Sequence, residues 1–343
     1  MRIKFYIAIT LCSYFVSAQQ QTLYTNITMH QFLYNPAFAG SNQGMQFNAG
    51  YRNQWTGFDG SPKVLMASGY GTFKKKPEMA LGGLVISDKS GLLQRNSFYG
   101  AYSYHVKLGK KLKLGFGLAA GAVLYNVKIY NAKPYDKDDE FLRNNIINAG
   151  AFDANSGLYL YSKKYFFGFS SQQLVNSKIQ WQKTKGNLTR HFYVYTGYTF
   201  TLDKKKKEWE LQPSVLMRFN NPAPSQMEIN LKTIYKQMAW LGGGYRFATS
   251  TLPGAAFGSS VYFLLGTTIS EQYTIGYSYD YAATNLQKYS SGSHEIILSY
   301  TISQKKKQTV SDKVSGDDES EFNNINNSMK SNLKNKKKDE EKK

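Results

Sequence analysis

Four histidines are the first residues of this chain that could carry acid–base chemistry: His30, His105, His191 and His294. A catalytic histidine needs a nucleophile within hydrogen-bond reach and a third group that orients its ring. Serines are plentiful, but none stands in a recognisable nucleophile motif. We therefore interpret the histidines as hydrogen-bonded structural residues, and the sequence predicts no enzyme.

Acidic and glycine-rich clusters are the next candidates, for binding a metal ion or a phosphate group. The carboxylates between Asp136 and Glu140 lack the spacing and the turn glycine of a calcium loop. Glu208 and Glu210 follow a run of lysines that compensates their charge. Residues 242–244 are three glycines after a tryptophan, a pattern typical of close backbone packing in a strand rather than of a phosphate-binding loop. The sequence accordingly predicts no metal site and no cofactor.

One stretch, YRNQWTGFDGSPK at residues 51–63, combines basic, aromatic and turn-forming residues. Asp59 and Gly60 are turn formers, while Trp55 and Phe58 are aromatic residues of the kind found at a membrane interface. The structural interpretation is the tip of a hairpin, and the functional one is a docking surface. Under the functional interpretation, the candidate partner-binding residues are Arg52, Trp55, Phe58 and Asp59.

The elements that must position these residues show strict alternation of apolar and polar side chains. In residues 272–282 the odd positions are tyrosine or isoleucine and the even positions are small or polar, and 227–235 and 293–303 repeat the pattern. A period of two residues is typical of half-exposed β-strands. The sequence predicts fourteen strands, near residues 43–54, 63–73, 78–87, 94–108, 112–129, 149–161, 165–174, 190–202, 208–219, 227–236, 239–248, 257–270, 272–282 and 293–303.

The predicted connections fall into two sets of different length. Short turns at 74–77, 109–111, 162–164, 203–207, 237–238 and 271 alternate with longer loops at 55–62, 88–93, 130–148, 175–189, 220–226, 249–256 and 283–292. Outer-membrane barrels have an even number of strands, short periplasmic turns and longer external loops. A soluble β-sandwich also shows alternation, but it has no reason to sort its loops by length. The predicted fold is therefore all-β, a transmembrane antiparallel β-barrel of the outer membrane with about fourteen strands.

Alternation also assigns faces to the side chains. His105 and His191 are expected to face the lumen, and Tyr277 and Leu298 to face lipid. Four charged residues are expected to line the lumen and to tolerate exchange for other polar residues: Glu210, Arg218, Glu228 and Lys232.

The two ends of the chain are expected to lie outside the barrel, which is assigned to residues 43–303. Residues 1–18 carry two basic residues, an apolar stretch and Val-Ser-Ala, which predicts a cleaved secretory signal peptide. Residues 19–42 are predicted to be a periplasmic segment that plugs or skirts the mouth of the barrel. Residues 304–343 are charged and poor in apolar side chains, which predicts a disordered periplasmic tail. Both termini are thus predicted in the periplasm.

The formal net charge of +20 raises the question of nucleic-acid binding. The lysines form short clusters in predicted turns, for example at 74–76 and 110–111. Proteins that bind nucleic acid usually gather basic residues on one element with groove-reading or base-stacking chemistry. We therefore expect no nucleic-acid partner. We expect outer-membrane lipid around the barrel. The lysine-rich turns are expected to form a positively charged rim of the protein on the periplasmic side.

The stretch QFLYNPAFAG at residues 31–40, followed by the stretch at 51–63, adds a motif to these patterns. Together they resemble the opening signature of the PorP/SprF family, outer-membrane barrel proteins of the type IX secretion system in Bacteroidota that are connected with gliding motility. Phe38 stands where the family often has tyrosine. The matching residues are Asn35, Pro36, Ala37, Ala39, Gly40, Arg52, Gln54, Trp55, Gly57, Phe58, Gly60 and Pro62.

The resemblance implies a non-enzymatic component that supports secretion or surface attachment of a specific cargo, such as a large gliding adhesin. It also implies association with periplasmic and lipoprotein parts of the secretion and motility machinery. The predicted external loops would offer the cargo an anchoring face. The alternative function is an outer-membrane diffusion channel or small-molecule transporter, which requires an open polar lumen.

Overall fold

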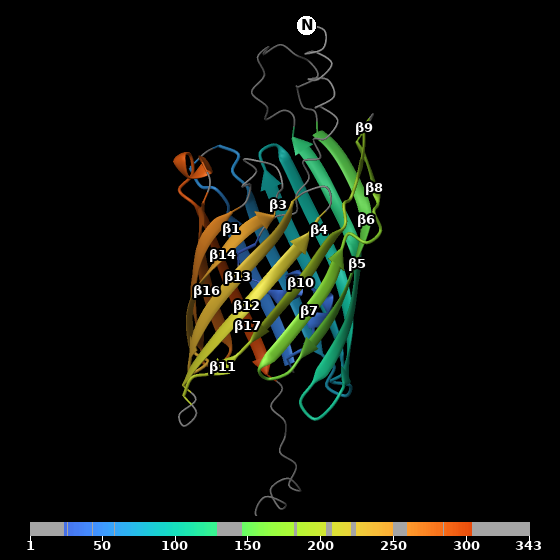
Figure 1. The fold of residues 1–343 in the computed structure, drawn as a ribbon. Helices are drawn as coiled ribbons and strands as arrows, with labels where there is room; N and C mark the ends of the chain where they lie inside the picture. The colour runs from blue at the N-terminus through green and yellow to red at the C-terminus, as the bar shows by residue number, and fades with distance from the viewer. Residues whose placement is uncertain are drawn as a thin grey trace, which may run out of the picture. The chain divides into compact units, whose positions relative to one another are not determined.

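In the computed structural model, one antiparallel β-sheet closes on itself as a barrel (Figure 1). The structure describes residues 24–25, 27–42, 44–57, 59–128, 146–181, 184–203, 208–220, 224–249, 259–283 and 285–303. Outside the described residues lie the predicted signal peptide, Phe58, the loop around Asp136 and the predicted 304–343 tail. Within the described part of the chain, no helix is long and apolar enough to cross a membrane.

Fourteen antiparallel strands form the wall, as the sequence predicts. They are β1 (Gly44–Asn53), β2 (Lys63–Thr72), β3 (Met79–Ser90), β4 (Leu93–Lys107), β5 (Lys113–Lys128), β6 (Ile146–Tyr161), β7 (Tyr165–Gln172), β10 (His191–Tyr198), β12 (Trp209–Phe219), β13 (Ser225–Tyr235), β14 (Ala239–Thr249), β15 (Ser260–Ile269), β16 (Tyr273–Ala282) and β17 (Ser293–Ser303). Neighbours in the chain pair along most of the wall, β1 pairs with β17, and β10 pairs with β12 across the excursion at β11 (Phe200–Thr201). The ring is thereby closed and has no free edge strand to leave backbone groups unpaired in lipid.

We call the two ends of the barrel the short-turn end and the long-loop end. At the long-loop end, one prediction is wrong. The sequence predicts a loop over 88–93, but Ser90 pairs with Leu93, so only Gly91 and Leu92 form the turn. Gly91 has a φ of +58°, the left-handed conformation that a two-residue hairpin turn requires. The loop after β7 also contains a hairpin that alternation did not predict, β8 (Lys178–Trp181) and β9 (Thr184–Asn187).

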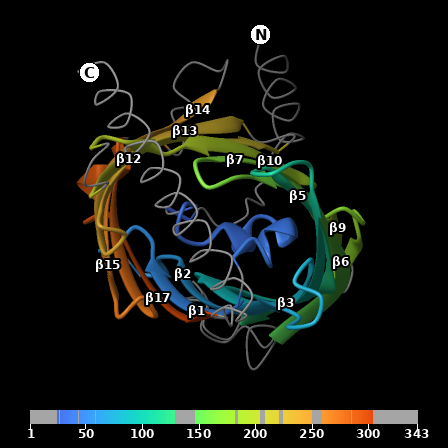
Figure 2. The same cartoon turned by 90° about the horizontal axis from the view of Figure 1, so that it is seen from below.

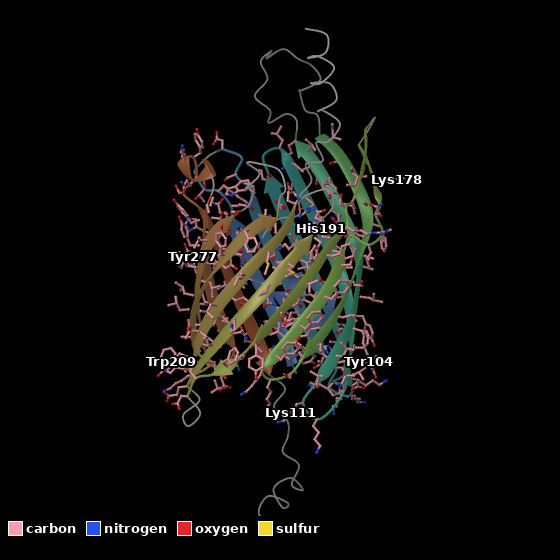
Figure 3. The ribbon with its side chains drawn as sticks, viewed as in Figure 1. Tyr104, Lys111, Lys178, His191, Trp209 and Tyr277 are labelled. Carbon is pink, nitrogen blue, oxygen red and sulfur yellow. The ribbon has the colours of Figure 1, made fainter. Side chains whose placement is uncertain are left out.

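The outer wall is apolar and the inner wall is polar. On β17, Ile296 and Leu298 are exposed, whereas Glu295 and Ile297, which alternate with them, are buried. Trp209 and Tyr104 are exposed near the short-turn end, where Lys111 lies in a turn (Figure 3). Exposed aromatic residues at this level are typical of the interfacial girdle of a membrane barrel.

The described residues of 24–42, which we call the plug, lie inside the barrel (Figure 2). The plug contains two short helices, η2 (Gln31–Leu33) and η3 (Pro36–Phe38), and a view along the barrel shows them within the ring of strands (Figure 2). Phe32, Leu33 and Tyr34 are buried in one cluster with inward side chains of the wall. The interior of the barrel at this level is therefore a packed core to which the plug contributes.

Candidate functional site

The plug packs against wall positions that have room only for glycine. A Cβ atom added to Gly117 on β5 would lie 2.1 Å from the backbone nitrogen of Ala37. A Cβ atom on Gly157 of β6 would lie 2.0 Å from Oδ1 of Asn35. Real Cβ atoms essentially never approach another atom this closely. The glycines of β5 and β6 thus form a surface on which the backbone of η3 and the side chain of Asn35 rest directly.

Asn35 fixes the plug to two strands at once. Its Oδ1 accepts a hydrogen bond from the Ala37 nitrogen at 2.9 Å and so caps η3, which Pro36 opens. Its Nδ2 donates to the carbonyl oxygen of Leu158 at 2.9 Å and reaches that of Phe169 at 3.4 Å. Leu158 on β6 pairs with Phe169 on β7, so one amide bridges both strands. This geometry gives the Asn-Pro-Ala part of the motif a structural reason.

The C-terminal end of the plug is fixed near the short-turn end. The carbonyl oxygen of Ala39 accepts hydrogen bonds from Ser103 Oγ and, at 2.6 Å, from His105 Nε2. Because a carbonyl can only accept, Nε2 carries the proton, and Tyr161 Oη donates to Nδ1 at 3.1 Å. Gly40 follows with a φ of +85°. His105 therefore faces the lumen, as alternation predicts, and it holds the plug.

His30 also has a structural role inside the lumen. Its Nε2 lies 3.0 Å from Ser68 Oγ and its Nδ1 lies 3.3 Å from Met66 Sδ. Burial lowers the pKa of His30 to about 4, because the charged imidazolium would lose its hydration. The ring is therefore neutral at pH 7. Within the described part of the chain, no group of three or more His, Cys, Asp or Glu residues could hold a metal ion.

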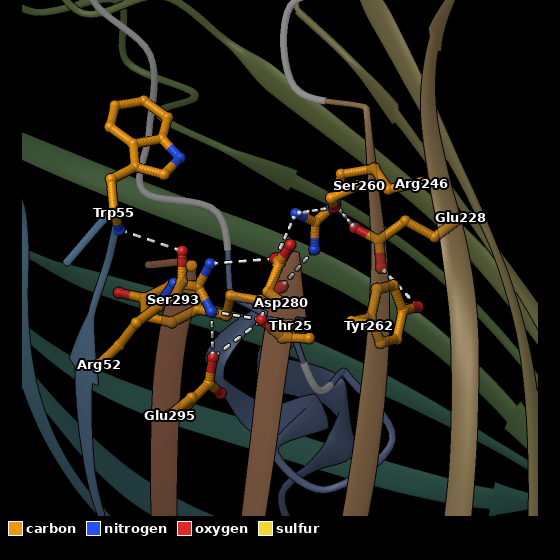
Figure 4. Close-up of polar contacts among 12 residues, drawn as sticks. Thr25, Arg52, Trp55, Glu228, Arg246, Ser260, Tyr262, Asp280, Ser293 and Glu295 are labelled. Atoms are coloured by element: carbon orange, nitrogen blue, oxygen red, sulfur yellow. Dashed lines mark hydrogen bonds and ion pairs between the residues drawn. The ribbon is translucent and has the colours of Figure 1, made fainter. Parts of the chain in front are cut away.

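Six charged side chains meet on the inner wall in what we call the charge network: Arg52, Arg218, Glu228, Arg246, Asp280 and Glu295. They come from six different strands, and Figure 4 labels all of them except Arg218. Their side chains are at most 8% exposed. Three positive and three negative groups balance, which is what low-dielectric surroundings demand of buried charges.

Shared carboxylates link the pairs of the network. Glu228 Oε1 lies 2.7 Å from both Arg218 Nη2 and Arg246 Nε. Asp280 Oδ2 lies 3.0 Å from Arg246 Nη1 and 3.2 Å from Arg52 Nη2. Arg52 Nη1 completes the chain at 3.0 Å from Glu295 Oε2. Arg52 and Arg246 each contact two carboxylates, and Arg218 shares Glu228 with Arg246, so the network behaves as a unit.

The N-terminal end of the plug is bound to this network near the long-loop end (Figure 4). The Thr25 nitrogen donates to Glu295 Oε2 at 2.9 Å, and Thr25 Oγ1 donates to Asp280 Oδ2 at 3.3 Å while it accepts from Arg52. The carbonyl oxygen of Tyr24 lies 3.3 Å from Arg218 Nη2 and 3.4 Å from Arg246 Nη2. The plug therefore runs from the network at one end of the lumen to His105 at the other.

The loop after β1 is joined to the loop before β17. The Trp55 nitrogen donates to Ser293 Oγ at 3.1 Å, and Thr56 exchanges backbone hydrogen bonds with Gly292 at 2.8 Å and with Ser291 at 2.6 Å. Trp55 has a φ of +55°, which is uncommon for a bulky residue and indicates strain held by the surrounding contacts. The loop is thus preformed.

The structure separates the four candidate partner-binding residues. Trp55 is half-buried and Asp59 is exposed in the rim loop, while Phe58 lies outside the described residues. Arg52 is 1% exposed, and its guanidinium group binds the plug and two carboxylates in the lumen. Sequence reasoning missed Arg246, Asp280 and Glu295 as members of the network. The available signal was charge on the inward face of predicted strands, but that signal does not say which charges pair.

The closed barrel, the apolar outer wall with its aromatic residues and the polar inner wall define an outer-membrane β-barrel protein. The toluene transporter TodX of P. putida has a similar fold, with a TM-score of 0.51 and 9% identity over 79% of this chain and 93% of that chain. The CymD monoaromatic hydrocarbon channel has a TM-score of 0.50 and 10% identity over 81% of this chain and 94% of that chain. At such identities the likeness shows the fold alone. No curated protein matches the chain.

The family model described as "Type IX secretion system membrane protein PorP/SprF" matches residues 16–300. The match includes the plug and almost the whole barrel. The chain therefore belongs to the PorP/SprF family, and the resemblance in the sequence is confirmed. Membership implies association with the type IX secretion machinery.

Proposed function

We propose that this protein is a non-enzymatic component of the type IX secretion system that supports secretion or surface attachment of a specific cargo, such as a large gliding adhesin. The observation that carries the proposal is the occupied lumen. The plug extends from the charge network to His105 and rests on wall glycines. A barrel filled by its own chain suits a scaffold better than a pore.

The proposed contact with the cargo is a surface at the long-loop end, which we call the rim surface. It is built from the described residues of loops 54–62 and 285–292. Tyr289 in this surface is 73% exposed, and Trp55 and Asp59 lie in the neighbouring loop. Gly60 accepts a backbone hydrogen bond from Gly91 at 2.9 Å, which fastens the surface to a third loop. Preformed aromatic surfaces bind partners with little loss of conformational entropy. Phe58 belongs to the same loop, and Arg52 supports the surface from the lumen.

The proposed contacts with periplasmic or lipoprotein components lie at the short-turn end. The turns there carry exposed lysines at 74–76, 110–111 and 163–164. This arrangement suits partners with acidic surfaces. The last strand, β17, ends at the short-turn end, which supports a periplasmic start of the 304–343 segment. The first described residues, Tyr24 and Thr25, lie near the long-loop end, so the periplasmic N-terminus stays a prediction that this geometry does not support. Labelling a tag placed after the predicted cleavage site, on intact cells, tests it.

Cargo retention on intact cells tests the function. Replacing Trp55 and Tyr289 together by alanine should leave a folded barrel but weaken cargo attachment, since buried aromatic residues at interfaces often contribute about 2 kcal/mol, which is about thirtyfold in affinity. Phe73→Ala, an exposed aromatic outside the rim loops, is the matched control. Unchanged cargo retention in the double variant would count against the rim surface.

The alternative, a diffusion channel, is favoured by the fold likeness to a toluene transporter and a hydrocarbon channel. It requires that solutes pass although the plug is in place. Deleting the gene separates the two functions. The channel function is supported if, in the deletion strain, surface cargo and gliding are unchanged while uptake of a small solute falls.

A further inference from the structure

The two ends of the plug are held by different chemistry. The helical part, from Gln31 to Gly40, is held mainly on β2 to β10, by apolar packing, by Asn35 and by His105, and its Tyr34 also meets Arg218 on β12. The N-terminal end is held on β1 and β12 to β17 by the charge network. Because most contacts of the helical part lie on strands that the network does not use, the N-terminal end can leave the network while the helical part stays docked.

The network makes contacts of the kind that recognise a polypeptide. Glu295 accepts a backbone N–H from Thr25, and the guanidinium groups of Arg218 and Arg246 face the backbone carbonyl of Tyr24. The threonine hydroxyl lies between Asp280 and Arg52. Backbone and hydroxyl groups are common to many sequences, so the contacts do not demand this one segment.

The site also has a place for an aromatic ring and unused hydrogen-bonding capacity. The ring of Tyr24 meets the ring of Tyr34 edge to face, with centroids 6.1 Å apart, and the guanidinium group of Arg218 lies 5.6 Å from the Tyr34 centroid. Within the described structure, Arg52 Nε, Arg218 Nε and Glu295 Oε1 are buried without a hydrogen-bond partner. Buried polar atoms of this kind are usually satisfied by a ligand or by water.

We propose that the charge network and Tyr34 form a peptide-binding site that the chain's own Tyr24–Thr25 occupies, and that a second polypeptide can take its place. The ligand is a short uncharged segment in which an aromatic residue precedes threonine or serine. The ligand enters from the long-loop end, because the network lies next to the rim loop. Ser293, two residues before Glu295, accepts a hydrogen bond from the Trp55 nitrogen in that loop. This proposal goes beyond the proposed function, since it holds whichever cargo the protein serves.

The test uses the mature full-length protein in detergent and a fluorescein-labelled peptide with the sequence of residues 21–29. Thr25→Pro removes the N–H that Glu295 accepts and weakens the hold on the chain's own segment. Fluorescence anisotropy should then show peptide binding at least tenfold tighter than in the unmodified protein, where the site is filled. Thr25→Val, which removes only the hydroxyl, should give a smaller gain in the same direction.

Network variants combined with Thr25→Pro show where the peptide binds. Glu295→Gln and Arg246→Met should each weaken binding at least tenfold, while Glu208→Gln, in an exposed ion pair with Lys236, should not change it. A peptide with valine in place of its threonine should bind more weakly. The proposal is overturned if neither Thr25 variant gains affinity, if a scrambled peptide binds equally well, or if the network variants bind as tightly as the Glu208→Gln control.

Discussion

Replacing Gly117 by alanine is expected to loosen the plug without disturbing the barrel wall. The new Cβ atom would lie 2.1 Å from the Ala37 nitrogen, whereas ordinary contacts begin at 3.4 Å, so η3 must move away from β5. Overpacking of this kind costs about 1–3 kcal/mol. The movement also strains the hydrogen bond from His105 to Ala39, and a typical hydrogen bond contributes about 1 kcal/mol. Together these costs are roughly 2–4 kcal/mol, which is about 30- to 900-fold in the population of undocked plug.

A cysteine at Leu33 reports this population. Cys12, in the predicted signal peptide, is the only cysteine of the chain, so the introduced thiol is the single label site of the mature protein. Leu33 is 4% exposed, and a charged thiol reagent should reach the cysteine only when the plug undocks. Its labelling rate should rise by the same factor in the Gly117→Ala background.

Gly100→Ala is the matched control, because nothing lies within 4 Å of the added Cβ atom. Both substitutions exchange a strand glycine for alanine, so their effects on strand propensity are similar. Equal labelling rates in the two backgrounds would refute the inference that the glycine surface of β5 holds the plug.

Three further predictions concern pH, the network and the wall. His30 has a pKa of about 4 when docked against 6.5 when free, so the undocked plug binds the extra proton. Docking should be unaffected above pH 7 and weaken by about 3 kcal/mol as pH falls from 6.5 to 4. His30→Gln should reduce this loss, measured at each pH as the labelling rate divided by that of the same protein unfolded in urea, because the ratio removes the pH dependence of the thiol itself. Glu228→Gln leaves Arg218 and Arg246 without their shared carboxylate and should lower the free energy of unfolding in urea by about 3–5 kcal/mol. Glu208→Gln, in an exposed ion pair, should change it by less than about 1 kcal/mol. Equal effects of the two substitutions would contradict a buried network. Leu298→Arg on the lipid-facing wall should make the free energy of folding into vesicles less favourable by about 2–4 kcal/mol. Leu108→Arg near the short-turn end should make it less favourable by about 0–1 kcal/mol. A larger loss at Leu108 than at Leu298 would show that the depths assigned to the two residues in the membrane are wrong.

The network also changes one expectation drawn from alternation. Sequence reasoning treats Arg218 and Glu228 as lumen residues that tolerate polar exchange. Their 2.7 Å ion pair is buried, and removal of one partner leaves an uncompensated charge. We therefore expect tolerance at Glu210 and Lys232 but not at Arg218 and Glu228. Urea unfolding of Glu228→Gln and of a polar exchange at Lys232, compared side by side, would show the difference in unfolding free energy.

The sequence by itself determined the strands and the faces of their side chains. Alternation is a local property, because successive residues of a strand point to opposite sides whatever the strand pairs with. Leu298 outward and His105 inward follow from it directly. The length of the chain between turns also fixed the number of strands. The tight turn at Gly91 was not predicted, because the pairing of Ser90 with Leu93, not the local turn residues, decides where β3 ends.

Only the tertiary structure decided which inward residues meet. Arg52 and Glu295 are 243 residues apart, and they form an ion pair because closure places β1 beside β17 with Arg52 opposite Glu295. Alternation assigns each of them to the lumen, but the partner depends on register and on closure of the ring. The same closure creates the space that the plug fills. The motif residues from Asn35 to Gly40 therefore acquire their contacts only when β5, β6 and β7 stand side by side, since no local pattern encodes a surface made of three strands.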